Sequence, residues 1–264
     1  MSFVKNYDPG KIHMDLPTSN YIYELPILSF SDIHGAVNLS LVFNYRMREE
    51  RGNLFHIAAG YKLNLQKCLI LEDGNPQALL EEDGKCTNFI STGGVYVLDN
   101  DDQRILRRSG TDFVLENMDY SKEIYDNTGK IVSAYDKYSN LVLSYGYDSS
   151  GRMTTITYRG SKIITFTYLN SQLVSITYAN CTTTLEYETN KTYINHYSGM
   201  KYSLLNTTDT STSVSTLPWR GFRAVAVDPN TLSVPSHSVE LIRRDSHNVD
   251  LFYQIGSNTV DTST

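Results

Sequence analysis

Acidic side chains recur at a regular interval in the middle of the chain. Asp126 and Asp148 each follow a tyrosine, and Glu188 stands at the same place after another tyrosine. Two carboxylates facing each other across a cleft are the working pair of glycoside hydrolases. Catalytic pairs do not recur with a structural period, whereas an aspartate at a turn satisfies nearby backbone N–H groups wherever the turn recurs. The spacing therefore favours a structural role for these acids, and we predict no catalytic residues.

No other arrangement of reactive residues predicts chemistry. The six histidines lack the spacing of a metal site, and the sequence contains neither a Gly-x-Ser-x-Gly motif nor a glycine-rich phosphate loop. His237 and His247 lie close in sequence, but we do not assign them as ligands. The cysteines are odd in number and form no Cys-x-x-Cys motif, so we expect buried free thiols, although Cys68 and Cys86 could meet on neighbouring strands. We therefore predict no metal, no cofactor and no enzymatic activity.

The acids belong to a sequence repeat. The segment Tyr125-Asp126-Asn127-Thr128-Gly129 returns as Tyr147-Asp148-Ser149-Ser150-Gly151, and a basic residue follows the glycine each time. Weaker copies begin at Tyr168 and Tyr187, so that the four tyrosines are separated by 22, 21 and 19 residues. Self-similarity at such a period indicates a repeat architecture.

Each copy predicts one β-hairpin. Tyrosine is a good strand former, the Asp-x-x-Gly that follows it is typical of a tight turn, and the glycine supplies a positive φ. Beyond the turn, Ile156 and Tyr158 alternate with polar residues, and Ile164, Phe166 and Tyr168 do the same after the next reversal. This period of two predicts an all-β fold, an array of consecutive antiparallel hairpins in one long sheet.

The pattern Tyr-Asp-x-x-Gly-Arg-Met at residues 147–153 resembles the YD repeats of Rhs proteins, which are related to those of teneurins and toxin-complex components. The first copy has Lys130 where arginine is usual, and the copy at Tyr168 has lost both the Asp and the Gly. The resemblance implies a curled sheet, which closes into a hollow shell in longer family members and encloses a toxic C-terminal segment in several of them. The residues that we assign to the structural motif are Tyr125, Asp126, Gly129, Tyr147, Asp148, Gly151, Arg152, Tyr168 and Tyr187.

The flanking sequence completes the predicted organisation. The charged run 46–52 is expected to be a solvated loop, and 76–82 a short helix or, more in keeping with the Asp-Gly pairs around it, part of a hairpin. The segments that we expect are an irregular N-terminal lead-in (1–20), an N-terminal Rhs-like β-sheet region (21–118), the YD-repeat hairpins (119–203), a Ser/Thr-rich linker (204–217), a C-terminal β capping segment (218–256) and a disordered tail (257–264).

Composition excludes several classes of partner. The 264 residues carry a formal net charge of −6, which argues against binding to nucleic acid or to an anionic membrane surface. No run approaches the roughly 18 apolar residues of a membrane helix. The N-terminus has no apolar segment of the kind found in a Sec-type signal peptide. We expect a secreted or cell-surface protein exported without such a signal, or alternatively a cytoplasmic protein before export.

Two functions remain in competition. The first is a non-enzymatic scaffold, a section of an Rhs-type β-shell that encases or presents a toxin or another partner polypeptide. The alternative is an adhesin-like module that binds carbohydrate or a receptor with its tyrosine-rich sheet face. A scaffold places the repeat tyrosines in an internal layer, whereas an adhesin exposes them. Because strands lie about 4.8 Å apart, we expect the sheet to be too short to enclose a protein, and its edges to be paired with a partner protein or a second copy, or covered by the C-terminal segment.

Overall fold

The computed structural model describes residues 11–15, 20–33, 35–99, 103–188, 191–205, 220–227, 237–244, 248–255 and 258–261, and for residues 11–21 and from 203 onward it describes the backbone alone. The described residues form an all-β fold, as the sequence predicts, with one short helix among them. In the described part of the chain, no helix is long and apolar enough to cross a membrane.

The first part of the chain forms a separate antiparallel sheet, called here the N-terminal sheet. Its strands follow one another in the order β1 (Lys11–Asp15), β2 (Asn20–Asp32), β3 (Gly35–Asn44) and β4 (Tyr61–Leu63), and the helix α1 (Tyr45–Arg51) lies between β3 and β4 in the chain. Strand β1 corrects the expectation of an irregular lead-in over 1–20. It pairs with β2 over its whole length, because Pro9, Gly10 and Pro17 flank the strand and do not interrupt it.

Helix α1 is a second correction, because it occupies most of the charged run for which a loop is predicted. The side chain of Asn44 accepts a hydrogen bond of 3.0 Å from the backbone N–H of Met47, which satisfies one of the free donors at the start of the helix. Met47 itself is buried, and Gly52 ends the helix with a φ of 60°. The cap precedes the charged run, and the buried side chains of Tyr45 and Met47 anchor the two turns of the helix.

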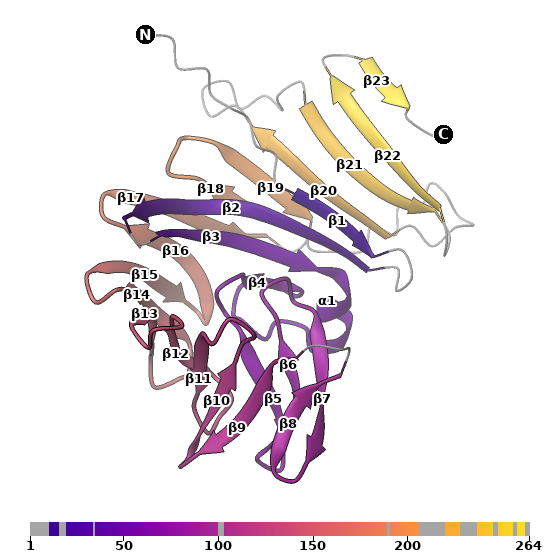
Figure 1. Cartoon of the computed structure of the whole chain (residues 1–264). Coiled ribbons are helices and arrows are strands. Elements are labelled where there is room, and N and C mark those ends of the chain that lie inside the picture. Colours follow the sequence, from indigo (N-terminus) through magenta and orange to yellow (C-terminus); the bar gives the residue numbers. More distant parts are fainter. Residues whose placement is uncertain are drawn as a thin grey trace.

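The rest of the chain forms one long antiparallel sheet in which each strand pairs with the strand before it, and this sheet is not closed into a barrel (Figure 1). Its strands are β5 (Cys68–Glu72), β6 (Asn75–Leu80), β7 (Cys86–Thr92), β8 (Val95–Leu98), β9 (Ile105–Ser109), β10 (Asp112–Glu116), β11 (Lys122–Tyr125), β12 (Ile131–Tyr135), β13 (Leu141–Tyr147), β14 (Met153–Tyr158), β15 (Lys162–Leu169), β16 (Gln172–Tyr178), β17 (Cys181–Tyr187), β18 (Lys191–Asn195), β19 (Lys201–Leu205), β20 (Arg220–Val227), β21 (His237–Arg244), β22 (Asn248–Ile255) and β23 (Asn258–Asp261).

The sheets divide the chain differently from the predicted segments. The region 21–118 is split between β4 and β5, because β5 to β10 belong to the same sheet as the repeats. The linker lies outside the described residues from position 206 on. Strands β20 to β22 continue the sheet within the predicted capping segment. In the predicted disordered tail, β23 pairs with β22, which satisfies its backbone groups on that side, and the remaining tail residues lie outside the described part.

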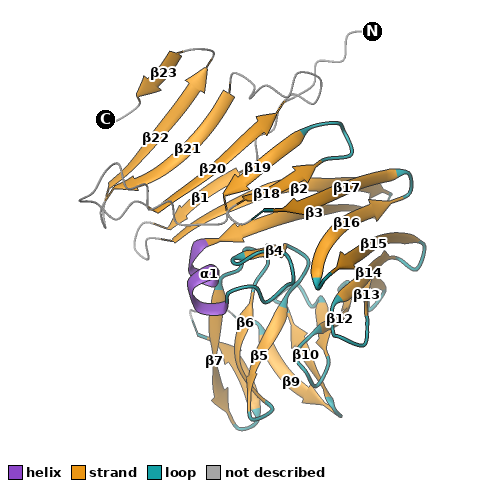
Figure 2. Ribbon diagram, turned by 180° about the vertical axis from the view of Figure 1, so that it is seen from behind, coloured by secondary structure: helices purple, strands orange, loops and turns teal. Residues whose placement is uncertain are grey.

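The N-terminal sheet lies across the long sheet. Figures 1 and 2 show β2 and β3 running alongside β16 to β18, and one continuous apolar core joins the two layers. We call the face of the long sheet that this core covers the inner face. Deeply buried members of the core include Leu25, Leu39, Leu41 and Leu63 from the N-terminal sheet, and Ile156, Ile164, Leu173 and Ile194 from the long sheet. A second, smaller core is formed by residues from the strands β5 to β12 of the long sheet.

The core tests the predicted alternation directly on β15. Ile164 and Phe166 are 1% and 3% exposed, whereas Ile163, which points to the opposite, solvent-facing side, is 51% exposed. Successive side chains of a strand point to opposite faces, so one residue step changes burial completely.

We predict that Ile164→Ala lowers the free energy of unfolding by about 2–4 kcal/mol, because it leaves a cavity in the core between the sheets. The matched variant Ile163→Ala, one residue away on the outer face, is expected to cost less than about 1 kcal/mol. Urea unfolding followed by circular dichroism measures both. Equal costs for the two variants would contradict the assignment of the inner face.

Candidate functional site

The repeated aspartates each organise their own turn. In the first copy, Oδ1 of Asp126 accepts hydrogen bonds from the backbone N–H groups of Thr128 (2.8 Å) and Lys130 (3.0 Å). Asp148 makes the same two bonds in its own turn, at 2.9 Å each. Hydrogen bonds from the Arg152 side chain and backbone also hold the pKa of Asp148 below its usual range. Each carboxylate is thus engaged within its own turn, and this arrangement provides no acid–base pair.

The turn glycines meet two separate demands. Gly129 and Gly151 have φ values of +84° and +77°, which side chains other than glycine rarely adopt. Gly129 also lies against β5, where the backbone N–H of Leu69 donates a bond of 2.7 Å to the Gly129 carbonyl. A Cβ atom at Gly129 would stand 2.4 Å from the carbonyl oxygen of Leu69. The first repeat turn therefore occupies part of the outer edge of β5, an edge that would otherwise stay open.

The repeat tyrosines form a ladder of hydrogen bonds between neighbouring units. Each hydroxyl donates to the backbone carbonyl of the apolar residue that follows the previous turn: Tyr147 to Ile131 (2.7 Å), Tyr168 to Met153 (2.8 Å) and Tyr187 to Leu173 (2.6 Å). Burial raises the pKa of all three phenols. The first tyrosine, Tyr125, is completely buried and donates to Glu123 at 2.5 Å. The ladder therefore joins consecutive hairpins through side chains as well as backbone.

The strand register breaks at the same tyrosines. The pairing shifts by one residue immediately before Tyr125, Tyr147 and Tyr168, and each of them then pairs opposite the apolar residue after its own turn. A β-bulge of this kind bends its strand and increases the local twist. The recurring bulge thus accounts for the curl of the sheet that the resemblance implies.

The basic residue after each turn glycine contacts the tyrosine of the next unit. The ammonium group of Lys130 lies 5.6 Å from the ring centroid of Tyr147, and the guanidinium group of Arg152 lies 5.0 Å from that of Tyr168. Arg152 also pairs with Asp148 through Nε and a terminal nitrogen, both at 2.7 Å. Tyrosine, cation and acid therefore form one contact chain between successive turns.

Sequence reasoning missed a further copy of the turn. Oδ1 of Asp136 accepts bonds from the backbone N–H groups of Tyr138 and Asn140, both at 2.9 Å, and Ser139 takes the positive φ (63°) that glycine takes elsewhere. The signal was present, because Tyr135 precedes this aspartate as in the other copies. Its turn joins β12 to β13, so it lies at the opposite end of the strands from the turns at Asp126 and Asp148.

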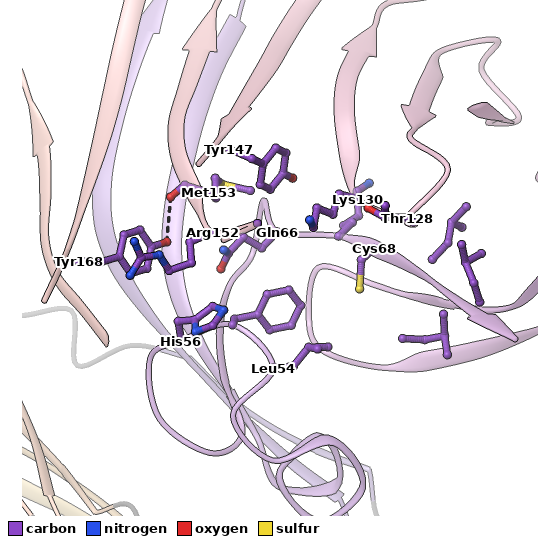
Figure 3. A pocket seen from close by; sticks show the side chains of 17 residues that line it. Leu54, His56, Gln66, Cys68, Thr128, Lys130, Tyr147, Arg152, Met153 and Tyr168 are labelled. Atoms are coloured by element: carbon purple, nitrogen blue, oxygen red, sulfur yellow. Dashed lines mark hydrogen bonds between the residues drawn. The ribbon is translucent and has the colours of Figure 1, made fainter. Parts of the chain in front are cut away.

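A cavity of about 310 Å³ lies beside the first two turns (Figure 3). One wall consists of the turn residues and of Tyr147 and Tyr168, and the other consists of residues 54–56 and 66–71. Most of the lining is apolar. Five of the site residues assigned from sequence lie on this wall: Gly129, Tyr147, Gly151, Arg152 and Tyr168. No sequence pattern indicated that residues 54–56 and 66–71 would face them.

A second, polar hollow lies beside the turn between β6 and β7 and contains paired charges. Lys67 forms an ion pair with Glu123 and a longer one of 3.5 Å with Glu82. The fully buried Lys62 donates to the backbone carbonyls of Glu81 (2.7 Å) and Glu82 (2.9 Å), and burial lowers its pKa to about 7. Because Lys62 belongs to β4, these bonds fasten the N-terminal sheet to the long sheet. They serve stability and offer no accessible nucleophile.

The cysteines and histidines form no metal site in the described residues. All three cysteines are free and half-buried. Cys68 on β5 and Cys86 on β7 each pair with Leu80 of β6, which lies between them. The two cysteines are therefore not on adjacent strands. Burial raises the pKa of the Cys68 thiol to about 11, which keeps it protonated at neutral pH. His247 lies outside the described residues, and the side chain of His237 is not described.

Comparison with known proteins agrees with this geometry. Residues 125–163, which span the first two turns and their strands, match the family model described as RHS Repeat. No curated protein matches the chain.

We predict that Gly129→Ala costs about 3 kcal/mol or more in the free energy of unfolding, because the new methyl group meets a backbone carbonyl and the residue must keep a positive φ. The matched variant is Gly110→Ala, which has a φ of +64° but no atom within 4 Å of the new methyl group. It is expected to cost about 1–2 kcal/mol. Chemical denaturation measures the difference, and equal costs would show that β5 does not press on the first turn.

Proposed function

We propose that this protein is a non-enzymatic scaffold, because the chain carries an RHS repeat and repeats of this family are generally structural. In this proposal it is a section of a β-shell whose inner face holds polypeptide. The toxin or other partner that such a section would encase or present, and a secreted or cell-surface location, are parts of the same proposal.

The observation that carries the proposal is that the inner face already holds a stretch of non-repeat polypeptide. Besides the shared core, backbone and side-chain hydrogen bonds join the two layers. The backbone N–H of Leu173 donates to the carbonyl of His56 at 2.7 Å, and Nε2 of His196 lies 2.8 Å from the carbonyl oxygen of Ile27. Residues 22–63 are therefore held partly by contacts that a second, unrelated polypeptide could also make, since on their side the two bonds above use only the backbone carbonyls of His56 and Ile27.

The aromatic residues at this interface add specificity. The rings of Phe30 and Tyr178 stack with their centroids 4.4 Å apart, and the hydroxyl of Tyr158 donates to Asp32 at 3.0 Å. Figures 1 and 2 show β21 to β23 continuing past the N-terminal sheet. We place the partner polypeptide along this continuation, because the inner face of the preceding strands is occupied.

A carbohydrate-binding role is a second candidate, but on different tyrosines from those expected. The repeat tyrosines are buried or half-buried, and their hydroxyl groups donate to backbone carbonyls or, in Tyr125, to Glu123. In contrast, Tyr120 and Tyr138 are 70% and 75% exposed. They lie on successive turns at the end of the strands opposite to the turns at Asp126 and Asp148. These turns are two strands apart, so the rings are separated by about 10 Å. Exposed tyrosine rings at such a distance offer stacking surfaces for two sugar rings of one glycan.

The scaffold proposal predicts that the inner face holds its polypeptide without a covalent link. A protease site inserted between Gly52 and Asn53, next to exposed residues at the end of α1, allows the purified protein to be cut into residues 1–52 and 53–264. We expect the two pieces to stay together in size-exclusion chromatography because the core between the sheets remains intact.

The same cut protein carries its own control. Phe166→Ala removes an aromatic ring from the inner face and should promote separation of the two pieces, whereas Thr165→Ala, exposed on the outer face, should leave them together. Separation of the unsubstituted pieces in native buffer, with residues 53–264 still folded, would refute the proposal that the inner face is a polypeptide holder.

The carbohydrate candidate has a separate test. A glycan array should return a specific ligand whose binding is lost in Tyr138→Ala, with Tyr147→Phe as the control because Tyr147 lies on the inner ladder. If no glycan binds, or if Tyr138→Ala binds as well as the unsubstituted protein, the exposed tyrosines are not a sugar-binding surface.

A further inference from the structure

The cavity beside the first two repeat turns is not explained by the scaffold role. Its volume of about 310 Å³ falls at the lower end of the range of small-molecule pockets, roughly 300–1,000 Å³. The chemistry of its lining therefore decides what it would accept.

Two hydrogen-bond donors in the lining have no acceptor. The side chain of Gln66, only 6% exposed as a residue, accepts a bond of 3.1 Å from the backbone N–H of Leu63 through Oε1. Its NH₂ group has no partner among the described residues, and a buried amide left in this way is costly. The ammonium group of Lys130 has no carboxylate within ion-pair distance in the described part of the chain, and it lies over the ring of Tyr147 and beside Gly151.

Figure 3 shows how these groups are placed. The amide of Gln66 reaches toward Arg152 and His56, and Lys130 enters from the other side, between Tyr147 and Cys68. His56 has a φ of 59°, an uncommon conformation for a residue other than glycine. Strained residues of this kind gather at binding sites, where the surrounding structure holds them in place.

Several other polar groups of the lining are already engaged, while the imidazole of His56 lies edge-on to the ring of Tyr168. The hydroxyls of Tyr147 and Tyr168 donate to backbone carbonyls, and Arg152 is paired with Asp148. What remains for a ligand is a surplus of donors and positive charge, surrounded by apolar walls that include Leu54 and Phe55. Such a site favours a ligand with an anionic acceptor group and an apolar body.

We propose that this cavity binds a small organic carboxylate, with the carboxylate held by Lys130 and Gln66 and the apolar body against Leu54 and Phe55. A free small acid and the C-terminal carboxylate of a peptide ending in an apolar residue share this chemistry. This proposal does not rest on the scaffold function, because all the residues that line the cavity belong to this chain and no partner polypeptide is needed to form it.

The test is isothermal titration calorimetry on the full chain with phenylacetate and hexanoate, with phenylacetamide as the neutral control. We expect the acids to bind with a dissociation constant of roughly 1 mM or tighter, and the amide to bind at least tenfold more weakly. The peptide Gly-Gly-Phe, with a free and with an amidated C-terminus, distinguishes the two sources. Tighter binding of the free peptide than of phenylacetate identifies a chain terminus, and weaker binding identifies a free acid.

Substitutions locate the binding. Lys130→Met keeps the side-chain stem and removes the charge, and Gln66→Glu keeps the acceptor for Leu63 while replacing the donor with a negative charge. Both should weaken binding at least tenfold. The matched control is Lys137→Met, because the Lys137 ammonium group lies 5.1 Å from a tyrosine ring on an exposed turn that does not line the cavity.

Thermal unfolding checks that each variant is folded, and Lys130→Met alone decides the question if Gln66→Glu is unstable. The proposal is overturned if neither the acids nor the free peptide bind the unsubstituted protein, if the amide binds as tightly as the acids, or if Lys130→Met binds as tightly as the unsubstituted protein.

Discussion

The structure depends on the need to cover one apolar face of a long sheet. A hairpin array whose strands alternate polar and apolar residues has one face that cannot remain in water. In this protein a second sheet from the same chain covers that face, and Leu39, Leu41 and Ile164 meet in one core. Neither layer could bury its apolar side chains alone, so the N-terminal sheet is part of the architecture and not an appendage.

The repeat turns solve a different problem, the register between hairpins. Backbone pairing alone permits a strand to slip by two residues without changing which side chains face the core. The hydroxyls of Tyr147, Tyr168 and Tyr187 each bond a particular carbonyl of the preceding unit. In Tyr147 and Tyr168 a bulge immediately before the tyrosine also fixes where the strand bends. Register and curvature are thus set by the same residue, which explains why this position recurs more faithfully than any other in the repeat.

Sequence reasoning succeeded where the information is local and failed where it is not. The hairpins follow from turn residues and alternation within about twenty positions, and residues 125–163 match the expected family. The turn at Asp136 escaped notice because Ser139 takes the place of glycine, and α1 because its cap, Asn44, belongs to the preceding strand. The packing of the two sheets and the cavity beside Lys130 join segments far apart in the chain, which no local pattern encodes.

The worn third copy separates the parts of the motif. It has lost the aspartate and the glycine, and a two-residue loop with positive φ at Asn170 and Ser171 now makes the reversal, as hairpins with such loops commonly do. Gln172 replaces the basic residue, so that no cation lies over the next tyrosine in the described contacts. Yet Tyr187 still bonds the carbonyl of Leu173. Turn chemistry has several solutions, whereas the link between units needs only one phenol and one backbone carbonyl, so the tyrosine persists after the rest of the motif has changed.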